Sequence, residues 1–326
     1  MSDSSLLLGV DGGGTKTIVW LAEKKPGITG SFRVVGVATG SPGNIKSQGF
    51  HQAMHNIVTT INDAFRNAGI KPNVVDCVCL GLAGAGRAQE QKEIRQWMIN
   101  KRVAKQAVVS GDAELLLAAN GKIEEPAADC NSGVCLVAGT GAMSWGRNSL
   151  GQTNRSGGWG HLIGDPGSGF SIGRFGVLLA CKAGDGRSDE VEFLVQLLRE
   201  MNLSSVEQLM QICSGPNWIE RIASVAPFVF SQIETSTTIS EFIRAEACSL
   251  ARMVHAVATR LELLGTRFPL ACTGSVLLKQ PVYRSLFEQE LELIGIGSEA
   301  CYYVTDPVIG ALRIAHQQLI ERDRSD

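Results

Sequence analysis

One local pattern occurs twice in this chain of 326 residues, and its repetition limits the folds that the chain can adopt. In the first half, the apolar run Leu6–Val10 leads through Asp11–Thr15 into a second run of β-type residues. In the second half, Val134–Ala138 leads through Gly139–Gly141 into Ala142–Trp145. Each copy is typical of two strands joined by a tight turn. The repetition predicts two related lobes.

Each half also contains a short apolar strand that ends in a glycine-containing turn before a helix. The two turns are Gly111-Asp112 and Gly274-Ser275. We pair them as the second element of the repeat. Two related lobes that face each other would bring all four turns to one cleft. The expected fold class is therefore α/β, with two lobes and a cleft between them.

The domain boundary is predicted in a polar stretch, Lys122–Asn131, which we interpret as the crossing between the lobes. The N-terminal lobe then spans residues 1–120 and is completed by the C-terminal helix, 308–326. The C-terminal lobe spans residues 121–307. Pro307 precedes the last helix, near the first helical position, where proline is favoured.

Apolar spacing predicts the other elements. One long amphipathic helix is expected from Ile45 to Ala68, closed by Gly69. The region from Phe170 to about Leu264 has a helical pattern. Further helices are expected at 88–100, 113–120, 281–295 and 308–320, and further strands at 32–38, 74–82, 107–110, 270–272 and 301–304.

Composition excludes several classes of protein. The net charge of −2 gives no electrostatic footprint for nucleic acid, and no Lys/Arg cluster suits anionic lipid. No apolar run reaches the roughly 20 residues needed to span a bilayer. The segment Met1–Ser5 lacks the basic region of a signal peptide. We therefore expect neither a nucleic acid nor a membrane as a partner.

The nine cysteines are scattered, and most lie in apolar runs, as Cys77, Cys79, Cys135 and Cys272 do. This usage is typical of buried, reduced thiols in a cytoplasmic protein. The sequence has no C-x-x-C pair, which argues against a zinc or iron–sulfur site.

The first turn, Asp11-Gly12-Gly13-Gly14-Thr15-Lys16-Thr17, has the composition of a phosphate site. Glycines lack Cβ, so their N–H groups can approach an anion and adopt unusual φ values. Several converging N–H groups form an anion nest. Thr15 adds a hydroxyl, and the Asp11 carboxylate could hold Mg²⁺ directly or through water. The spacing matches neither a P-loop nor G-x-G-x-x-G, and a glycine-rich hairpin without a ligand is the alternative.

These motifs carry a family resemblance. The segments Asp11–Thr17, Ala138–Gly141 and Thr273–Ser275 resemble the two phosphate motifs and the adenosine motif of the fold shared by actin, hexokinase and the heat-shock chaperone ATPases. Within this ribonuclease H-like fold, the chain resembles the N-acetylglucosamine kinase / BadF-BcrA ATPase family. Its most specific match is the glycine-dense stretch Gly157–Ser168. The resemblance covers nearly the whole chain and is weakest between Arg187 and Ser249.

The resemblance implies an enzyme with two lobes that close over ATP and an amino sugar. It implies transfer of the γ-phosphoryl group of ATP to a sugar hydroxyl, usually on carbon 6, with Mg²⁺. The BadF-type branch that activates dehydratases carries cysteines for an iron–sulfur cluster. Because no cysteine spacing here supports such a cluster, the sugar-kinase branch is favoured.

Asp112 matches the catalytic aspartate of the family. A carboxylate within hydrogen-bond reach of the acceptor hydroxyl would orient it and take its proton. The resemblance also makes Asp112 a substrate contact. The alternative is that Asp112 only caps the helix that follows it, a common role of aspartate.

The resemblance implies a set of nucleotide-binding residues. Asp11 is in addition the expected metal anchor, and a simple Asx turn is the alternative. Gly139-Thr140-Gly141 would supply a second set of phosphate donors, and a plain hairpin turn is its alternative. The weak motif Gly84, Gly86 and Arg87 could line the phosphate region. The expected ATP contacts are Asp11, Gly12, Gly13, Gly14, Thr15, Lys16, Gly139, Thr140, Gly141, Gly274 and Ser275.

Five positions match sugar contacts of the family: Asn44, Gly158, Trp159, Gly160 and Asp165. Asn and Asp side chains can hold vicinal hydroxyls. Trp159 could offer an apolar face to the sugar or be a core tryptophan, and Asp165 could belong to a simple turn. His161 is expected to be structural.

Two other functions remain open: a BadF-type ATPase or a kinase of another small polyol, and a non-catalytic nucleotide or sugar sensor. The sequence does not choose among glucosamine, N-acetylglucosamine and N-acetylmuramic acid. A homodimer is compatible with the sequence, although no surface patch in it predicts one.

Overall fold

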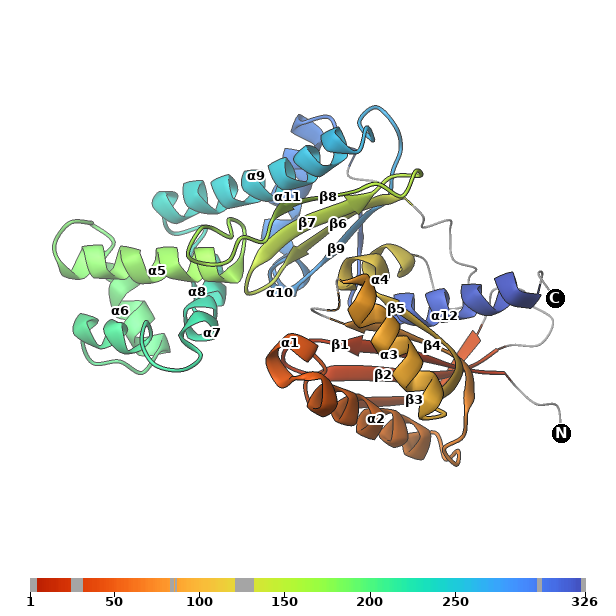
Figure 1. Cartoon of the computed structure of the whole chain (residues 1–326). Coiled ribbons are helices and arrows are strands. Elements are labelled where there is room, and N and C mark those ends of the chain that lie inside the picture. The colour runs from red at the N-terminus through yellow and green to blue at the C-terminus, as the bar shows by residue number, and fades with distance from the viewer. Residues whose placement is uncertain are drawn as a thin grey trace. The chain divides into compact units, whose positions relative to one another are not determined.

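The computed structural model describes residues 5–24, 32–82, 85, 87–120, 132–297 and 301–323. The chain divides into two compact units, which are Met1–Cys130 with Asp306–Asp326, and Asn131–Thr305. Each unit holds a mixed five-stranded sheet with helices packed against it (Figure 1), which confirms the α/β class. The predicted crossing at Lys122–Asn131 lies outside the described residues.

The sheet of the first unit has the order β3-β2-β1-β4-β5. β1 and β2 form the predicted antiparallel hairpin, and β3 continues it on the far side of β2. β4 runs parallel to β1, and β5 runs parallel to β4. The strands are β1 (Leu6–Gly12), β2 (Thr17–Lys24), β3 (Phe32–Gly40), β4 (Val75–Leu82) and β5 (Ala104–Ser110).

Successive side chains of β1 point to opposite faces of this sheet, so they show which helices cover each face. Leu8 and Val10 belong to the core under α2 (Phe50–Asn67) and α3 (Ala88–Asn100). Leu7 belongs to the core of the opposite face, under α4 (Asp112–Ala118) and the C-terminal helix α12 (Val308–Asp323) (Figure 1). Gly9 allows close contact on that face, because a Cβ there would lie 2.9 Å from Leu312 Cγ.

The predicted long helix from Ile45 to Ala68 is wrong in one respect, because it consists of two helices. α1 (Ile45–Gln48) ends at Gly49, and α2 begins at Phe50. Gly49 has a φ of 77° and a ψ of 154°, which no α-helix can contain. α1 has only four residues and one apolar side chain, Ile45, so it shows no periodicity of its own that could reveal the break.

The second unit repeats the topology with the order β10-β9-β6-β7-β8. β6, β7 and β8 are antiparallel neighbours, whereas β9 is parallel to β6 and β10 is parallel to β9. The strands are β6 (Gly133–Ala138), β7 (Ala142–Arg147), β8 (Thr153–Gly157), β9 (Leu270–Thr273) and β10 (Cys301–Tyr303).

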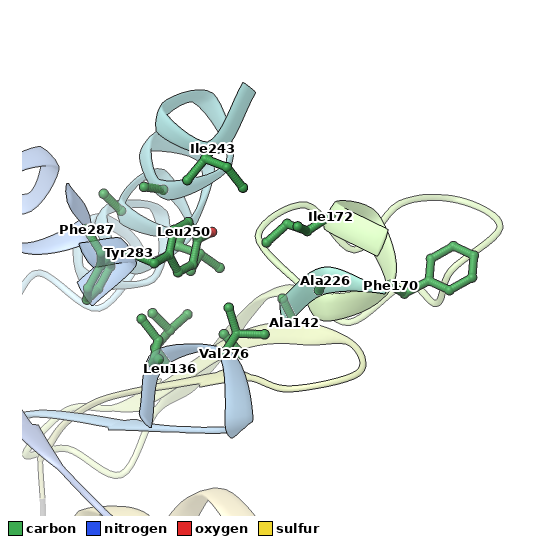
Figure 2. Packing of buried hydrophobic residues seen from close by; sticks show 14 of the residues in the cluster. Leu136, Ala142, Phe170, Ile172, Ala226, Ile243, Leu250, Val276, Tyr283 and Phe287 are labelled. Atoms are coloured by element: carbon green, nitrogen blue, oxygen red, sulfur yellow. The ribbon is translucent and has the colours of Figure 1, made fainter. Parts of the chain in front are cut away.

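Helices between β8 and β9 make up most of the rest of this unit, as the helical pattern predicts. Their bounds are α5 (Gly169–Gly184), α6 (Val191–Glu200), the 3-10 turn η1 (Val206–Gln211), α7 (Trp218–Ala223), α8 (Ala226–Ser231) and α9 (Thr237–Arg260). α10 (Ser275–Lys279) and α11 (Pro281–Leu293) follow β9. Figure 2 shows how Leu136 of the sheet, Leu250 of α9 and Phe287 of α11 share one core.

The topology corrects one part of the repeat. β9 occupies the place of β4, and β10 occupies the place of β5. The counterpart of the turn after β5, Gly111-Asp112, is therefore the segment after β10, whereas Gly274-Ser275 corresponds to the turn after β4. Strand spacing alone could not reveal this, because β8 was not expected. The sequence of β8, Thr-Asn-Arg-Ser-Gly, is polar, and the strand lies at the sheet edge.

Two findings concern the whole described chain. The described cysteines are free thiols, and Cys77, Cys79, Cys135 and Cys272 are buried as predicted. In the part of the chain that the structure describes, no helix combines the length and the apolar character needed to cross a membrane.

Candidate functional site

The β1–β2 turn is closed by its own backbone. The N–H of Gly13 donates to the carbonyl of Lys16 at 3.0 Å, and the carbonyl of Gly13 accepts from the N–H of Gly43 at 3.2 Å. Gly14, Thr15 and Lys16 are exposed. Gly13 therefore holds the turn, and any donors to a phosphate would come from the three exposed residues.

The glycines of this turn do not use unusual φ values, and Gly12 serves close packing. None of Gly12, Gly13 and Gly14 has a positive φ. A Cβ on Gly12 would lie 2.5 Å from Leu82 Cδ2, so a side chain there would displace the end of β4. The expectation that these glycines take φ values that other residues avoid was wrong, since none of the three has a positive φ.

Asp11 and Asp112 are brought together by the register of three parallel strands. Asp11 of β1 pairs with Gly81 of β4, and Gly81 pairs with Ser110 of β5, two residues before Asp112. Carboxyl ends of parallel strands share one sheet edge, the usual place for ligands in α/β sheets. A side chain on Gly81 would collide with Leu115, 2.0 Å from its Cβ position.

Both carboxyls have altered acidity. Burial and, second, the negative charge of Asp112 raise the pKa of Asp11 to about 6, although the Lys16 ammonium lowers it. Asp112 is exposed, yet the protein around its carboxyl removes enough water to raise its pKa. Perturbed carboxyls at a strand-end edge are typical of functional sites. A divalent cation would offset their repulsion, and hard oxygen donors suit Mg²⁺.

The capping role that competed for Asp112 belongs to another residue. The N-cap of α4 is Gly111, and Asp112 is the first helical residue. The carboxylate of Glu114 accepts the Gly111 N–H at 3.1 Å and also accepts the Ser110 hydroxyl. Glu114 thus completes the helix start and leaves Asp112 available for other contacts.

Asn44 caps α1 and lies beside the β1–β2 turn. Its Oδ1 accepts from Lys46 N at 2.9 Å and Ser47 N at 3.4 Å. Its Nδ2 lies 4.0 Å from the Cβ position of Gly14. The side chain is thus fixed by its cap, with the amide nitrogen directed to the predicted phosphate turn.

The β6–β7 turn of the second unit is held by α5. Gly139 N–H donates to Gly141 O at 2.9 Å. The first N–H groups of α5 donate back to it, from Gly169 to Gly139 O at 2.7 Å and from Phe170 to Thr140 O at 3.1 Å. The start of α5 therefore fixes the shape of this turn.

The adenosine and second phosphate motifs meet in this unit. Gly274 has a φ of 103°, and a Cβ there would lie 2.3 Å from Ala138 O, so only glycine allows this approach to β6. A pocket of about 270 Å³ opens between the β6–β7 turn, the start of α5, the α7–α8 region and α10. It is lined by Gly139, Thr140, Gly169, Glu220, Ala223, Ser224, Ala226, Pro227, Phe230, Ser275, Val276, Lys279 and Gln280.

Asp165 lies next to the same turn. Its Oδ2 is 2.9 Å from the Cβ position of Gly141, and the residue is 9% exposed. Its Oδ1 is buried and makes no hydrogen bond within the described part of the chain. A buried carboxylate oxygen without a donor is costly, so Asp165 stays a candidate ligand-binding residue.

The alternative that Trp159 is a core residue is wrong. Trp159 is 63% exposed, and the Arg155 guanidinium lies 5.0 Å from its ring centre. Gly158 and Gly160, on either side, have φ values of 67° and 89°, which this glycine-rich loop requires. His161 packs edge-on against Phe170 and Trp218, in agreement with a structural role.

The predicted residues therefore gather in two groups. Asp11, Asp112, Asn44 and the β1–β2 turn lie in the first unit, and the remaining positions lie in the second. The single cleft for all of them stays a prediction. Gly84 and Gly86 lie outside the described residues, and Arg87 is exposed at the start of α3.

Sequence reasoning missed the wall of the pocket that α7 and α8 supply. Glu220, Ser224 and Phe230 lie in the region where the family resemblance is weakest. Glu220 and Phe230 are on helices of six residues each, and Ser224 directly follows the first of these helices. Such short helices carry little periodicity. Pro227, at the start of α8, was the one local signal there.

The comparisons with known proteins agree on one family. The model of the BadF/BadG/BcrA/BcrD ATPase family matches residues 8–315. An N-acetylmuramic acid/N-acetylglucosamine kinase of Clostridium acetobutylicum is 29% identical over 315 residues, covering 96% of this chain and 98% of the relative. An N-acetyl-D-glucosamine kinase of Dictyostelium discoideum is 26% identical over 329 residues, covering 95% and 97%.

Solved structures show the same fold. A proposed N-acetylglucosamine kinase from Chromobacterium violaceum superposes with a TM-score of 0.73 at 22% identity, covering 95% of this chain and 98% of the other. The ROK hexokinase of Thermus thermophilus superposes with a TM-score of 0.56 at 14% identity, covering 98% and 99%. The fold is that of hexokinase-like, actin-type ATPases.

Proposed function

The chain belongs to the BadF/BadG/BcrA/BcrD ATPase family, and from this premise we propose that it is an ATP-dependent amino-sugar kinase. The two relatives that align over nearly the whole chain are both named as kinases that act on N-acetylglucosamine. The acceptor we propose is accordingly N-acetylglucosamine or a close amino sugar, phosphorylated on the hydroxyl of carbon 6.

The pocket of the second unit is the observation that carries the proposal. Gly139 and Thr140 from one motif and Ser275 from another line the same cavity, although they are far apart in sequence. Its lining includes the buried apolar residues Ala226 and Phe230, together with polar residues such as Glu220, Ser224 and Lys279. A planar base against these apolar residues and phosphates near the Thr140 turn would use both kinds of lining.

Asp112 is the proposed catalytic base. Its raised pKa makes it a better proton acceptor than an ordinary aspartate, because basicity increases with pKa. It would accept the proton of the sugar hydroxyl and orient that oxygen toward the γ-phosphorus. Glu114 supports this role, since it carries the helix cap itself.

Asp11 is the residue we propose to hold Mg²⁺, directly or through water. When bound, the cation would neutralise charge on the transferred phosphoryl group. The exposed Thr15 hydroxyl and the Lys16 ammonium would contact the phosphates from the same turn. Asp112 would influence the bound cation only through its negative charge, which already raises the pKa of Asp11.

The sugar would be held by Asn44, by the Gly158-Trp159-Gly160 loop and by Asp165. Asp165 Oδ1 has no donor among the described residues, and a sugar hydroxyl could donate to it. Trp159 is exposed and already stacks with Arg155, so it can offer a ring face to a ligand.

The described free thiols support a reducing compartment, so the cytoplasm is the location we propose. A homodimer is kept as a hypothesis.

The decisive experiment is a substrate panel with the purified chain. ATP and Mg²⁺ are combined with N-acetylglucosamine, glucosamine, N-acetylmuramic acid or glucose, and ADP release is followed. ADP release that requires one of the amino sugars supports the proposal, and ³¹P–¹H correlation in the product tests carbon 6. ADP release without sugar at a comparable rate would instead support an ATPase, and ATP binding without turnover would support a sensor.

A further inference from the structure

A buried carboxylate outside the predicted site contacts the turn that carries Asp165. Glu246 belongs to α9, and only 8% of its surface is exposed. Its Oε2 accepts the N–H of Gly167 at 2.6 Å, across 79 positions of sequence. It also forms a side-chain hydrogen bond with Ser171. A charge buried at this depth is costly unless several donors satisfy it, so its position calls for an explanation.

The same turn is held from a second helix. The hydroxyl of Tyr283, on α11, donates to the carbonyl of Gly167 at 3.3 Å. Tyr283 is fully buried, and Figure 2 shows it beside Leu250 of α9. Both backbone polar groups of Gly167 are therefore bonded to side chains from distant helices.

Gly167 also has no freedom to move toward α9. Its φ of 82° is accessible mainly to glycine. A Cβ on it would lie 2.3 Å from Leu250 Cδ2, so the backbone is pressed against this side chain. The turn Asp165–Ser168 is thus fixed by two hydrogen bonds and one packing contact.

This fixation matters most for Asp165. The β6–β7 turn has its own bonds to α5, from Gly169 and Phe170, which do not involve Glu246. Asp165 contributes its carbonyl to Ser168 N at 3.2 Å, and its side chain projects toward Gly141 from the fixed turn. A looser turn would therefore displace the Asp165 carboxylate more than the phosphate donors.

We propose that Glu246, together with Tyr283, is a positioning residue that sets the Asp165 carboxylate for the acceptor sugar. The proposal rests on the kinase function proposed above. It means that α9 and α11, which are far in sequence from Asp165, contribute to binding of the acceptor sugar. Its kinetic signature is a higher KM for the sugar with an unchanged KM for ATP.

Four variants test it. Glu246→Leu removes the acceptor at similar size, and Glu246→Gln keeps an oxygen that can accept the Gly167 N–H. Tyr283→Phe removes only the hydroxyl and keeps the packing. Tyr303→Phe is the matched control, because it breaks a 2.6 Å bond to Glu288 in the same unit without touching the turn. Melting temperature, both KM values and kcat are measured for N-acetylglucosamine and ATP.

We expect Glu246→Leu to raise the sugar KM about tenfold or more and Tyr283→Phe about threefold, as loss of a buried hydrogen bond implies. The ATP KM stays within about twofold of wild type. Glu246→Gln restores most of the sugar affinity. Tyr303→Phe lowers the melting temperature and leaves both KM values unchanged. An unchanged sugar KM in Tyr283→Phe and Glu246→Leu overturns the proposal.

Amide hydrogen exchange separates this proposal from the function on which it rests. Exchange in the segment 163–170 is expected to become faster in Glu246→Leu and Tyr283→Phe, and to remain unchanged in Tyr303→Phe. If exchange there does not change, the positioning role is overturned even in an active kinase. If the wild-type chain transfers no phosphoryl group to any sugar, the function fails, and the exchange result still decides whether Glu246 and Tyr283 hold the turn.

Discussion

Glu114 caps the helix that Asp112 begins: its carboxylate accepts the N–H of Gly111 at 3.1 Å. Two acidic residues thus stand two positions apart in the first turn of α4, with different surroundings. Glu114 is bonded to the backbone and to the Ser110 hydroxyl, whereas Asp112 is exposed at the edge where Asp11 also lies. This division of roles makes the catalytic proposal for Asp112 separable from helix stability.

The first prediction concerns Asp112→Asn. Because Glu114 supplies the cap, the fold and the affinity for the sugar are expected to stay close to wild type. Loss of a general base is expected to lower kcat by about 10²- to 10⁴-fold. The rate of ADP release and calorimetric binding of N-acetylglucosamine measure the two effects. Near-wild-type turnover would remove Asp112 from the chemistry.

The second prediction concerns the partner in this relationship. Glu114→Ala leaves the N–H of Gly111 and the hydroxyl of Ser110 without their acceptor. We expect the free energy of unfolding to fall by about 1 to 2 kcal/mol. Chemical denaturation measures the change. If stability does not change, the hydrogen bonds that Glu114 accepts from Gly111 and Ser110 contribute nothing to it.

Much of the first unit could be predicted because its signals are local. The Leu6–Val10 run and the glycine turn after Asp11 predict a hairpin, and the hairpin is present. The proximity of Asp11 and Asp112 follows from the parallel pairing through Gly81, which no local signal encodes. The Gly49 break was missed because α1, with four residues and one apolar side chain, is too short to show a periodicity of its own.

The second unit was harder because its site depends on contacts between distant segments. Glu246 bonds Gly167 from 79 positions away, and Tyr283 bonds the same residue from 116 positions away. No sequence motif marks Glu246 or Tyr283 as a partner of Gly167. In the sequence, a buried Glu on an amphipathic helix cannot be told from an exposed one. The predicted turn at Gly139–Gly141 is closed by its own backbone, whereas the pocket wall from Glu220 to Phe230 required the fold.

The third prediction concerns Mg²⁺ and Asp11. The pKa of Asp11 is about 6, so the carboxylate is ionised at pH 7.5 and can bind a cation. With ATP present, Mg²⁺ is expected to raise the melting temperature of the wild-type chain, since a ligand of the folded state stabilises it. In Asp11→Asn, we expect a much smaller shift and at least about a 100-fold loss of kcat. Titration with EDTA serves as the control, and an equal shift in the variant would exclude Asp11 as the anchor.

The fourth prediction concerns the pocket. Ala223 lines it, and its Cβ lies 3.7 Å from the Cβ position of Gly169. Ala223→Leu would occupy part of the roughly 270 Å³ cavity and is expected to raise the KM for ATP at least about tenfold, leaving sugar affinity unchanged. Ala245→Leu, on an exposed position of α9, adds the same atoms elsewhere. ATP binding that tolerates Ala223→Leu would place the nucleotide outside this pocket.

The last prediction is a pH dependence of stability that Glu246 produces. Burial raises the pKa of Glu246 above its ordinary value of 4.5, although the Gly167 N–H and a Ser171 hydrogen bond lower it in part. Tyr283 is the titratable group that faces it from α11. Because the folded state keeps this proton to higher pH than the unfolded state, stability is greatest below about pH 4.5. It falls as the pH rises through the raised pKa, and it is level above that pKa.

Glu246→Gln removes this dependence, because its amide does not titrate. Compared with wild type, the variant is therefore expected to gain stability as the pH rises from 4.5 to 7.5. Urea denaturation at several pH values measures the difference, and Glu241→Gln, exposed on the same helix, is the matched control. A difference that is the same at every pH would mean that Glu246 does not change its protonation between the folded and unfolded states. Its hydrogen bond to Gly167 would then be the whole of its contribution.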